Sequence, residues 1–304
     1  MVYQPTSEED EILYWSHIVN SVLNALLTIT TIIFNSVTIQ AFRKTSSLPH
    51  PLKTMLLSLA VSDLGVGLLV QPFYIGLLVN WLQRNISTDA THTAFLVIGP
   101  IFSTVSFLGV MLLSVDRFLA VQLHLRYQER VTHKRVVAVV ISTWVYSACL
   151  SLFYTVWISP DISYTVVAIS GVVYLVFSAM LHFTIYLAVQ RHRVQIQALQ
   201  VQPVAQNGQI ANAAKLTKSA VGVFYVYLVF WLCYLPMFCS SALVVIAGIS
   251  TDVKVFFMTS FTLLYLNSTL NPVIYCWKVR HVRRAVLNIL RNILPNQNWE
   301  ESQI

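Results

Sequence analysis

The few ionisable side chains that lie within apolar sequence define the chemistry open to this chain. Asp63 stands inside the run "LSLAVSDLGVG", and Asp116 and Arg117 follow directly after "FLGVMLLSV". A lone carboxylate in apolar surroundings must be protonated, hydrogen-bonded or paired with a cation, because an uncompensated buried charge is costly. An adjacent acid and base can instead neutralise each other. These residue types therefore indicate cation binding or hydrogen bonding at Asp63 and ion pairing at Asp116.

The elements that must position these residues are predicted to be membrane-spanning helices. The chain has 304 residues, of which 56% are hydrophobic and only 10% are charged, a composition that a soluble globule of this length cannot bury. Apolar stretches of roughly 20 residues or more, enough to cross a bilayer as helix, occur at 14–42, 52–82, 93–121, 136–158, 164–189, 216–248 and 253–277. We therefore predict an all-α membrane protein with a bundle of seven transmembrane helices.

The distribution of basic residues predicts the orientation of this bundle. All 19 lysines and arginines except Arg84 and Lys254 fall on one side of the seven stretches. The positive-inside rule then places residues 1–13 outside the cell, residues 14–277 in the plasma membrane as the seven-transmembrane domain, and residues 278–304 in the cytoplasm. The net charge of +7 is explained by this basic belt facing anionic membrane lipids, so no nucleic-acid partner is expected.

Three surface features follow from the same arrangement. The segment "KVRHVRRAVLNILRNIL" alternates basic and apolar residues at helical spacing, which predicts a short amphipathic helix on the membrane surface after the seventh span. The connection between the fifth and sixth spans is the longest, and we expect it to be helical at both ends. "NIS" at Asn85 is a glycosylation sequon in a loop that we expect outside the cell.

Catalytic and cofactor chemistry have little support within these spans. A membrane enzyme needs paired acids, a metal cluster or a nucleophile beside its base. The spans hold Asp63, scattered hydroxyls and His182, which has no acidic neighbour at a matching position. The four cysteines show no disulfide or metal spacing. We therefore predict a protein that is not an enzyme and has no cofactor apart from a candidate sodium ion at Asp63.

Each predicted span also carries one short motif, and the seven motifs occur in a characteristic order. They are Asn35 in "FNSVTI", "LAVSD" ending at Asp63, "DRF" at 116–118, Trp144, Tyr186 in "IYLAVQRHR", "FWLCYLP" at 230–236 and "NPVIY" at 271–275. Each motif is weak alone, but the set is specific. Over nearly its whole length the chain resembles the rhodopsin-like (class A) G-protein-coupled receptors.

The resemblance implies an activation switch at the cytoplasmic side. Asp116 and Arg117 would hold the resting state, and Arg117 would be released to a heterotrimeric G protein. The prolines would act as hinges because each removes a helical hydrogen bond, two tyrosines would swing inward to meet Arg117, and a third would sense the ligand. The residues with these roles are Asp116, Arg117, Tyr186, Tyr234, Pro236, Asn271, Pro272 and Tyr275.

Two departures from the family pattern concern this switch. Phe118 stands where the family has a tyrosine, which removes a hydroxyl but leaves the ion pair intact. Leu216 stands where many relatives carry an acid that gives Arg117 a second partner. We therefore expect a weakly held resting state with measurable ligand-independent signalling.

The resemblance further implies that Asp63 is the carboxylate of a sodium site. Side chains with oxygen atoms from other helices would enclose the ion together with Asp63, and the candidates are Asn35, Ser106, Asn267, Ser268 and Asn271. The alternative is an interhelical hydrogen-bonded contact that holds no ion.

The outer half of the bundle limits the choice of ligand. Gly99 stands where amine receptors carry an aspartate, and Tyr265 stands where visual pigments carry the retinal lysine, so an amine ligand and opsin chemistry are not expected. His92 replaces the usual disulfide-forming cysteine, Ser178 replaces a proline, and the loop after the fourth span is short. These features resemble the melanocortin, cannabinoid and lysophospholipid receptors.

An uncharged small molecule or a lipid fits the remaining candidates best, because ligand pockets are mostly apolar with a few polar anchors. The pocket candidates are Phe73, Ser103, Tyr234, Met237, Phe238, Phe261 and Tyr265. Receptor kinase and arrestin are further expected partners, although Ser302 is the only hydroxyl residue after Tyr275. A constitutively active or heteromerising receptor-like protein without a ligand, and a transporter or channel, are the alternatives.

Overall fold

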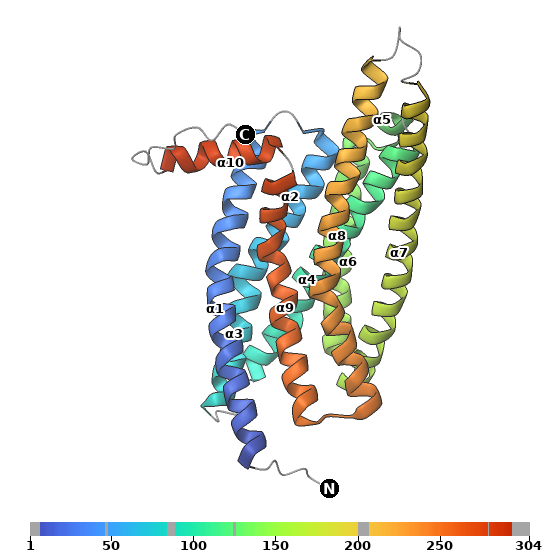
Figure 1. Ribbon diagram of the computed structural model, residues 1–304. Coiled ribbons are helices and arrows are strands. Elements are labelled where there is room, and N and C mark those ends of the chain that lie inside the picture. The colour runs from blue at the N-terminus through green and yellow to red at the C-terminus, as the bar shows by residue number, and fades with distance from the viewer. Residues whose placement is uncertain are drawn as a thin grey trace.

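The computed structural model describes residues 7–45, 48–83, 89–123, 126–199, 207–278 and 280–293, and these residues contain helices only (Figure 1). The helices are α1 (Ser7–Lys44), α2 (His50–Gly65), the π-helix η1 (Val66–Val70), α3 (Gln71–Leu82), α4 (Asp89–Leu123), α5 (Tyr127–Arg130), α6 (His133–Trp157), α7 (Pro160–Leu199), α8 (Asn207–Ala247), α9 (Thr251–Lys278) and α10 (Arg280–Ile293). The prediction of an all-α protein is confirmed.

Seven spans run side by side along the long axis of the bundle in Figure 1. The second span consists of α2, η1 and α3, which follow one another without interruption. Six of the described spans are long and apolar enough to cross a membrane. The seventh, α9, has 28 residues but is less apolar, because it carries the polar residues Asn267, Ser268, Thr269 and Asn271, all of them buried. It is a membrane span whose polar side chains face protein.

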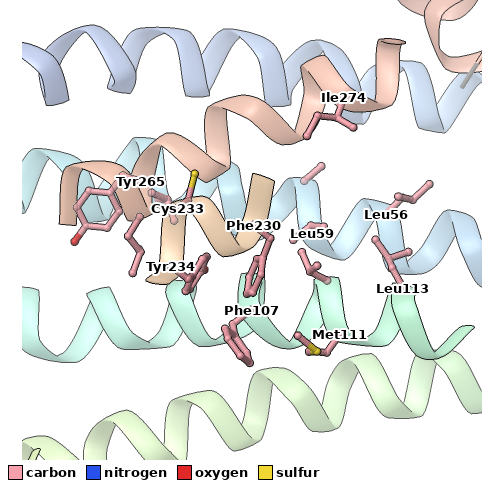
Figure 2. Packing of buried hydrophobic residues seen from close by; sticks show 14 of the residues in the cluster. Leu56, Leu59, Phe107, Met111, Leu113, Phe230, Cys233, Tyr234, Tyr265 and Ile274 are labelled. Atoms are coloured by element: carbon pink, nitrogen blue, oxygen red, sulfur yellow. The ribbon is translucent and has the colours of Figure 1, made fainter. Parts of the chain in front are cut away.

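The packing of the bundle is the reverse of that of a soluble protein. Large apolar side chains such as Trp157, Val172 and Met180 are exposed on α6 and α7, where lipid would cover them. The interior combines aromatic and aliphatic residues, and Figure 2 shows Phe107 and Met111 of α4 beside Phe230 of α8. Polar and apolar groups therefore share the interior, and this arrangement is what brings the predicted site residues together.

The ends of the helices refine several predicted boundaries. α1 begins at Ser7, within the segment that we expected to precede the first span. Only Ile158 and Ser159 separate α6 from α7, because α7 already begins at Pro160, a residue suited to the first helical turn. α7 continues to Leu199 and α8 starts at Asn207, so the connection between them is helical at both ends, as predicted.

The amphipathic helix after the seventh span is confirmed as α10, which crosses the end of the bundle in Figure 1. Its Val282 and Ile289 are buried, whereas Arg283 and Arg284 are exposed. α10 packs against α1 and α9, so its apolar face anchors it at the end of the bundle where the switch residues Asp116 and Arg117 lie.

Three predictions fall outside the described part of the chain. The sequon residue Asn85 lies in the undescribed segment 84–88, and Ser302 lies in the undescribed segment 294–304. The side chain of Leu216 is also outside the description, although its backbone is part of α8. Glycosylation, the role of Ser302 and the effect of Leu216 in place of an acid remain predictions from the sequence.

Candidate functional site

The first part of the site is a polar cluster around Asp63 in the middle of the bundle. Asp63 on α2 is fully buried, and its two carboxylate oxygens have different partners. Ser106 Oγ on α4 donates to Oδ1 at 3.1 Å, and Asn271 Nδ2 on α9 donates to Oδ2 at 2.9 Å. One carboxylate therefore connects three helices, and the structure brings together the residues that the sequence pointed to.

Two other predicted members of this cluster, Asn35 and Asn267, are less direct partners. Asn35 Nδ2 on α1 donates to the backbone carbonyl oxygens of Thr31 and Ser268, each at 3.0 Å, and so joins α1 to α9 next to the carboxylate. Asn267 is fully buried, and neither of its amide atoms has a hydrogen-bond partner among the described residues. The sequence identified the right group of residues, but it did not show which of them touch Asp63.

The donor set fits the candidate sodium ion. Hard cations prefer oxygen ligands, and the cluster has oxygen atoms that no described residue satisfies. These are the amide oxygens of Asn35, Asn267 and Asn271. The carboxylate of Asp63 and the hydroxyl of Ser106 complete a set of oxygens with one formal negative charge, which suits a monovalent ion.

The second part of the site is an ion pair at the end of α4. Arg117 Nε donates to Asp116 Oδ2 at 3.0 Å, and Arg117 Nη2 contacts the same oxygen. Asp116 is buried, and its other oxygen, Oδ1, accepts a hydrogen bond of 2.6 Å from the hydroxyl of Tyr127 on α5. Both carboxylate oxygens are therefore occupied, one by a guanidinium and one by a phenol.

Tyr127 is a functional candidate that the sequence did not reveal. It lies in the short helix α5 between the third and fourth spans, 11 residues after Asp116. Burial, followed by the neighbouring Asp116 carboxylate, raises the pKa of Tyr127. The phenol therefore stays protonated at physiological pH and can donate to Asp116. We call Asp116, Arg117 and Tyr127 the cytoplasmic latch, because the basic residues predict that this end of the bundle faces the cytoplasm.

The two tyrosines expected to meet Arg117 lie apart from each other. Tyr186 on α7 is 58% exposed, and its hydroxyl accepts a hydrogen bond from Gln190 Nε2 one turn later. Tyr275 on α9 is buried beside Phe42 with 6.0 Å between ring centroids, and its hydroxyl has no partner among the described residues. Their inward movement toward Arg117 therefore stays a prediction from the sequence.

The third part of the site is a stack of aromatic rings between α4 and α8. Tyr234 stacks on Phe230 with 4.2 Å between ring centroids and packs against Phe107 at 5.5 Å. Its hydroxyl donates to the carbonyl oxygen of Ser103 at 3.2 Å. The rings of Tyr234, Phe230 and Phe107 lie together in Figure 2. Pro236, the proline expected to act as a hinge, lies two residues further along α8, close to a ring that contacts α4.

The outer half of the bundle contains a second aromatic group. Phe261 and Tyr265 on α9 pack with Tyr74 on α3 and Phe95 on α4. The ring centroid of Tyr74 lies 5.5 Å from that of Phe261. It lies 5.6 Å from the centroids of both Tyr265 and Phe95. Tyr74 and Phe95 were not among the residues predicted from the sequence. We call these four residues the outer aromatic cluster.

Tyr74, and not the predicted Phe73, joins this cluster. Tyr74 is 4% exposed and its hydroxyl donates to the carbonyl oxygen of Met258, whereas Phe73 is only half-buried at the edge of the core. The physical reason is η1, because a π-helix contains more residues per turn than an α-helix. The residues after η1 are therefore rotated relative to an alignment that counts along a regular helix from Asp63.

The remaining pocket candidates lie where α8 meets α7 and α9. A Cβ atom added to Gly171 would come within 2.4 Å of the ring of Phe238, so the absence of a side chain lets this ring pack on the backbone of α7. The hydroxyl of Ser260 donates to Met237 Sδ at 3.3 Å. Phe238 and Met237 therefore form the α8 wall of the outer half.

Two further polar groups were also missed. His182 stacks on Tyr227 with 3.6 Å between ring centroids and lies 3.4 Å from the hydroxyl of Ser114, which links α7, α8 and α4. On α1, buried polar side chains recur at helical spacing and face α9. Their 3.6-residue period is visible in the sequence, but only the bundle shows which helix they face.

Comparison with known proteins agrees with this geometry. A model of the 7 transmembrane receptors (rhodopsin family) matches residues 34–275. The chain is 27% identical to the high-affinity lysophosphatidic acid receptor of Xenopus laevis over 286 residues, which cover 80% of this chain and 74% of that receptor. It is 27% identical to the 5-hydroxytryptamine receptor 7 of Xenopus laevis in an alignment of 337 positions that covers 92% of this chain and 78% of that receptor.

A shorter similarity is found with dopamine receptor 4 of Caenorhabditis elegans, at 27% identity over 154 residues that cover 50% of this chain but only 29% of that receptor. These relatives are receptors and not enzymes, in agreement with the predicted absence of a catalytic function. The ordered motifs, the polar cluster around Asp63 and the family match over most of the chain lead to one conclusion: this chain belongs to the rhodopsin family of seven-transmembrane receptors, the G-protein-coupled receptors for extracellular ligands.

Proposed function

We propose that this receptor transmits the binding of an uncharged or lipid-like molecule outside the cell to a heterotrimeric G protein inside it. The single observation that carries this proposal is the cytoplasmic latch. Arg117 is held on Asp116, and Tyr127 occupies the other oxygen of the same carboxylate. A guanidinium so held at the end of a span is a group that can be released to a protein partner.

The mechanism is a shift in population between two packings of the bundle. A ligand that contacts the outer aromatic cluster would favour a packing in which Tyr234 leaves Ser103 and α8 bends at Pro236 away from α4. Arg117 would then be exposed to the G protein. Because coupling between two sites is reciprocal, the bound G protein must tighten ligand binding by the same factor.

Sodium at Asp63 would act on the same equilibrium. The ion would occupy the polar cluster in the resting packing, where Asp63 joins α2, α4 and α9. A change in the position of α9 relative to α4 would separate Ser106 from Asn271 and weaken the binding of the ion. Sodium would therefore oppose activation, and an agonist would reduce sodium affinity.

The ligand class follows from the walls of the outer half. Gly99 offers no charge to a protonated amine, and its nearest neighbours are Phe95 and Val70. One relative is named for lysophosphatidic acid, an anionic lipid. On the side of this chain predicted to be outside, the sequence offers only Arg84 and Lys254 as fixed cations. An uncharged lipid or small apolar molecule therefore fits better than either an amine or a phosphate ester.

The test is a G-protein dissociation assay in cells across a library that contains lipids, small apolar molecules and amines. We expect a ligand-dependent response that is lost in Arg117→Ala and that loses its sodium dependence in Asp63→Asn. A response that survives Arg117→Ala, or an ion current without G-protein coupling, would overturn the proposal. Surface expression of each variant serves as the control for folding.

Ligand-independent signalling is the second candidate function. It rests on Leu216, which cannot supply the acidic partner that would hold Arg117 a second time. We expect basal G-protein dissociation to exceed that of a Leu216→Glu variant at equal surface expression. A receptor that is silent without agonist, and unchanged by this substitution, would exclude this second function.

The membrane orientation and the remaining partners belong to the same proposal. We infer that the receptor lies in the plasma membrane. The distribution of basic residues favours an N-terminus outside the cell and a C-terminus in the cytoplasm. Receptor kinase and arrestin would then act on the cytoplasmic face. Ser302 is a candidate phosphorylation site in the tail, and loss of arrestin recruitment in Ser302→Ala would test this role.

A further inference from the structure

A line of buried polar side chains runs along one face of α1, and its middle part, from Asn20 to Asn35, contacts α9. Its fully or almost fully buried members are His17, Asn20, Asn24, Thr31, Asn35 and Thr38. Thr28, which is partly buried, fills the gap between Asn24 and Thr31, so almost every helical turn contributes one polar group. Apolar residues would pack this interface more cheaply in a membrane, because a buried polar group needs a partner. The line therefore requires an explanation beyond packing.

Hydrogen bonds to α9 explain part of this line. Asn24 Nδ2 donates to Thr262 Oγ1 at 2.7 Å, and Thr262 Oγ1 donates to Asn20 Oδ1 at 2.6 Å. One level further in, the hydroxyls of Thr31 and Thr269 lie 2.6 Å apart. We call this interface, from His17 to Asn35 on α1 and from Thr262 to Asn271 on α9, the polar seam.

Several buried atoms of the polar seam have no hydrogen-bond partner among the described residues. They are Ser21 Oγ and Asn24 Oδ1 near the outer end and Asn35 Oδ1, Asn267 Oδ1, Asn267 Nδ2 and Asn271 Oδ1 near Asp63. Buried polar groups in folded proteins are satisfied by protein or by ordered water, and a site suits water when several polar groups converge on it. The seam offers both donors and acceptors from its outer to its inner end.

Among the described residues, aromatic rings fill much of the bundle centre between its outer face and Asp63. The outer aromatic cluster joins α3, α4 and α9 above the level of Asp63. Below it, Tyr234, Phe230 and Phe107 fill the space between α4 and α8 with stacked rings. Water or a small ion that moves between the outer face and Asp63 would have to displace these rings, whereas the polar seam passes beside them.

We propose that the polar seam between α1 and α9 binds a chain of water molecules and is a side entrance through which water and small monovalent cations reach Asp63. The outer end of this entrance lies at His17, which stacks on Trp81 with 3.9 Å between ring centroids. The proposal of a water chain does not depend on ligand binding or on G-protein coupling. Only the passage of the cation rests on the proposed sodium site.

The experiment is a hydroxyl-radical footprint of the purified receptor in lipid nanodiscs, with radicals generated by a short X-ray pulse after mixing with water labelled with heavy oxygen. Radicals formed from bound water oxidise nearby side chains even when these are buried. Tyr74 is the reporter, because it is 4% exposed and its hydroxyl donates to Met258, one turn before Thr262. Heavy oxygen incorporated into oxidised Tyr74 shows that the bound water beside it exchanges with bulk solvent.

We expect Tyr74 to be oxidised in the unmodified receptor, and oxidation to fall severalfold in Asn24→Leu and in Thr262→Val, which remove polar groups from the seam. Leu23→Ala, on the exposed side of α1, is the matched control and should leave oxidation unchanged. An unlabelled Tyr74 in the unmodified receptor overturns the proposal without any variant. So does labelling that both seam variants leave intact. No ligand or G protein is present, so this outcome is separate from the test of receptor function.

Discussion

Removing the hydroxyl of Tyr127 is the sharpest test of the cytoplasmic latch. Tyr127→Phe keeps the ring and its packing and deletes only the donor that lies 2.6 Å from Asp116 Oδ1. Asp116 is buried, so the oxygen that loses this donor has little water to replace it. The resting packing, which contains the contact, is therefore destabilised relative to an active packing in which the latch is open.

The magnitude follows from the kind of bond that is lost. A hydrogen bond to a charged group contributes about 1.5–3 kcal/mol. Tyr127 is only half-buried, so the lower end of that range applies, about 1.5 kcal/mol. Since roughly 1.4 kcal/mol corresponds to a tenfold change in an equilibrium constant, the ratio of active to resting receptor should rise by about tenfold.

The assay is ligand-independent G-protein dissociation at matched surface expression. We expect basal signal to rise in Tyr127→Phe, with Gln128→Ala, an exposed neighbour on the same short helix, as the control that leaves it unchanged. Tyr127 stays protonated because its pKa is raised, so the basal signal of the unmodified receptor should not change through this group between neutral and mildly alkaline pH. An unchanged or lower basal signal in Tyr127→Phe would refute the assignment of Tyr127 to the latch.

Three other predictions concern ion binding, packing and topology. Sodium at ten times its dissociation constant should stabilise the receptor by about 1.4 kcal/mol, and a melting curve should show no such effect in Asp63→Asn. Gly65→Ala should lower the melting temperature by the equivalent of about 1–3 kcal/mol, because its Cβ would lie 2.1 Å from the ring of Phe102, whereas Gly76→Ala, with no close neighbour, should not. The unmodified receptor should show a glycosidase-sensitive mass shift that Asn85→Gln abolishes, and a receptor without this shift would contradict the predicted orientation.

The sequence alone predicts the spans and the members of the central polar cluster because both depend on composition and on order along the chain. A membrane imposes helix length, and a carboxylate in an apolar run requires polar neighbours. Partner choice is different. Asn271 and Ser106 touch Asp63, whereas Asn35 binds the backbone of Ser268. These contacts depend on how the helices are rotated in the bundle.

Two failures have identifiable physical causes. Tyr74 was missed because η1 changes the helical register after Asp63, and a π-helix has no reliable sequence signal. Tyr127 was missed because its role depends on the placement of a four-residue helix outside the spans, which hydrophobic periodicity does not report. The polar line on α1 has a visible period in the sequence, but Asn35 was the only one of its members named as a candidate.

The position of the three parts of the site along α4 explains how they can act as one switch. The carbonyl of Ser103 holds Tyr234, Ser106 holds Asp63, and Asp116 with Arg117 forms the latch. Ser106 and Asp116 are ten residues apart on one helix, or roughly 15 Å. α4 is continuous between these two residues. An axial shift or rotation of α4 that breaks the contact between Ser103 and Tyr234 therefore also acts on the polar cluster and on the latch. The affinities of the receptor for ligand, cation and G protein would thus all depend on the position of α4, which is the physical requirement for reciprocal coupling.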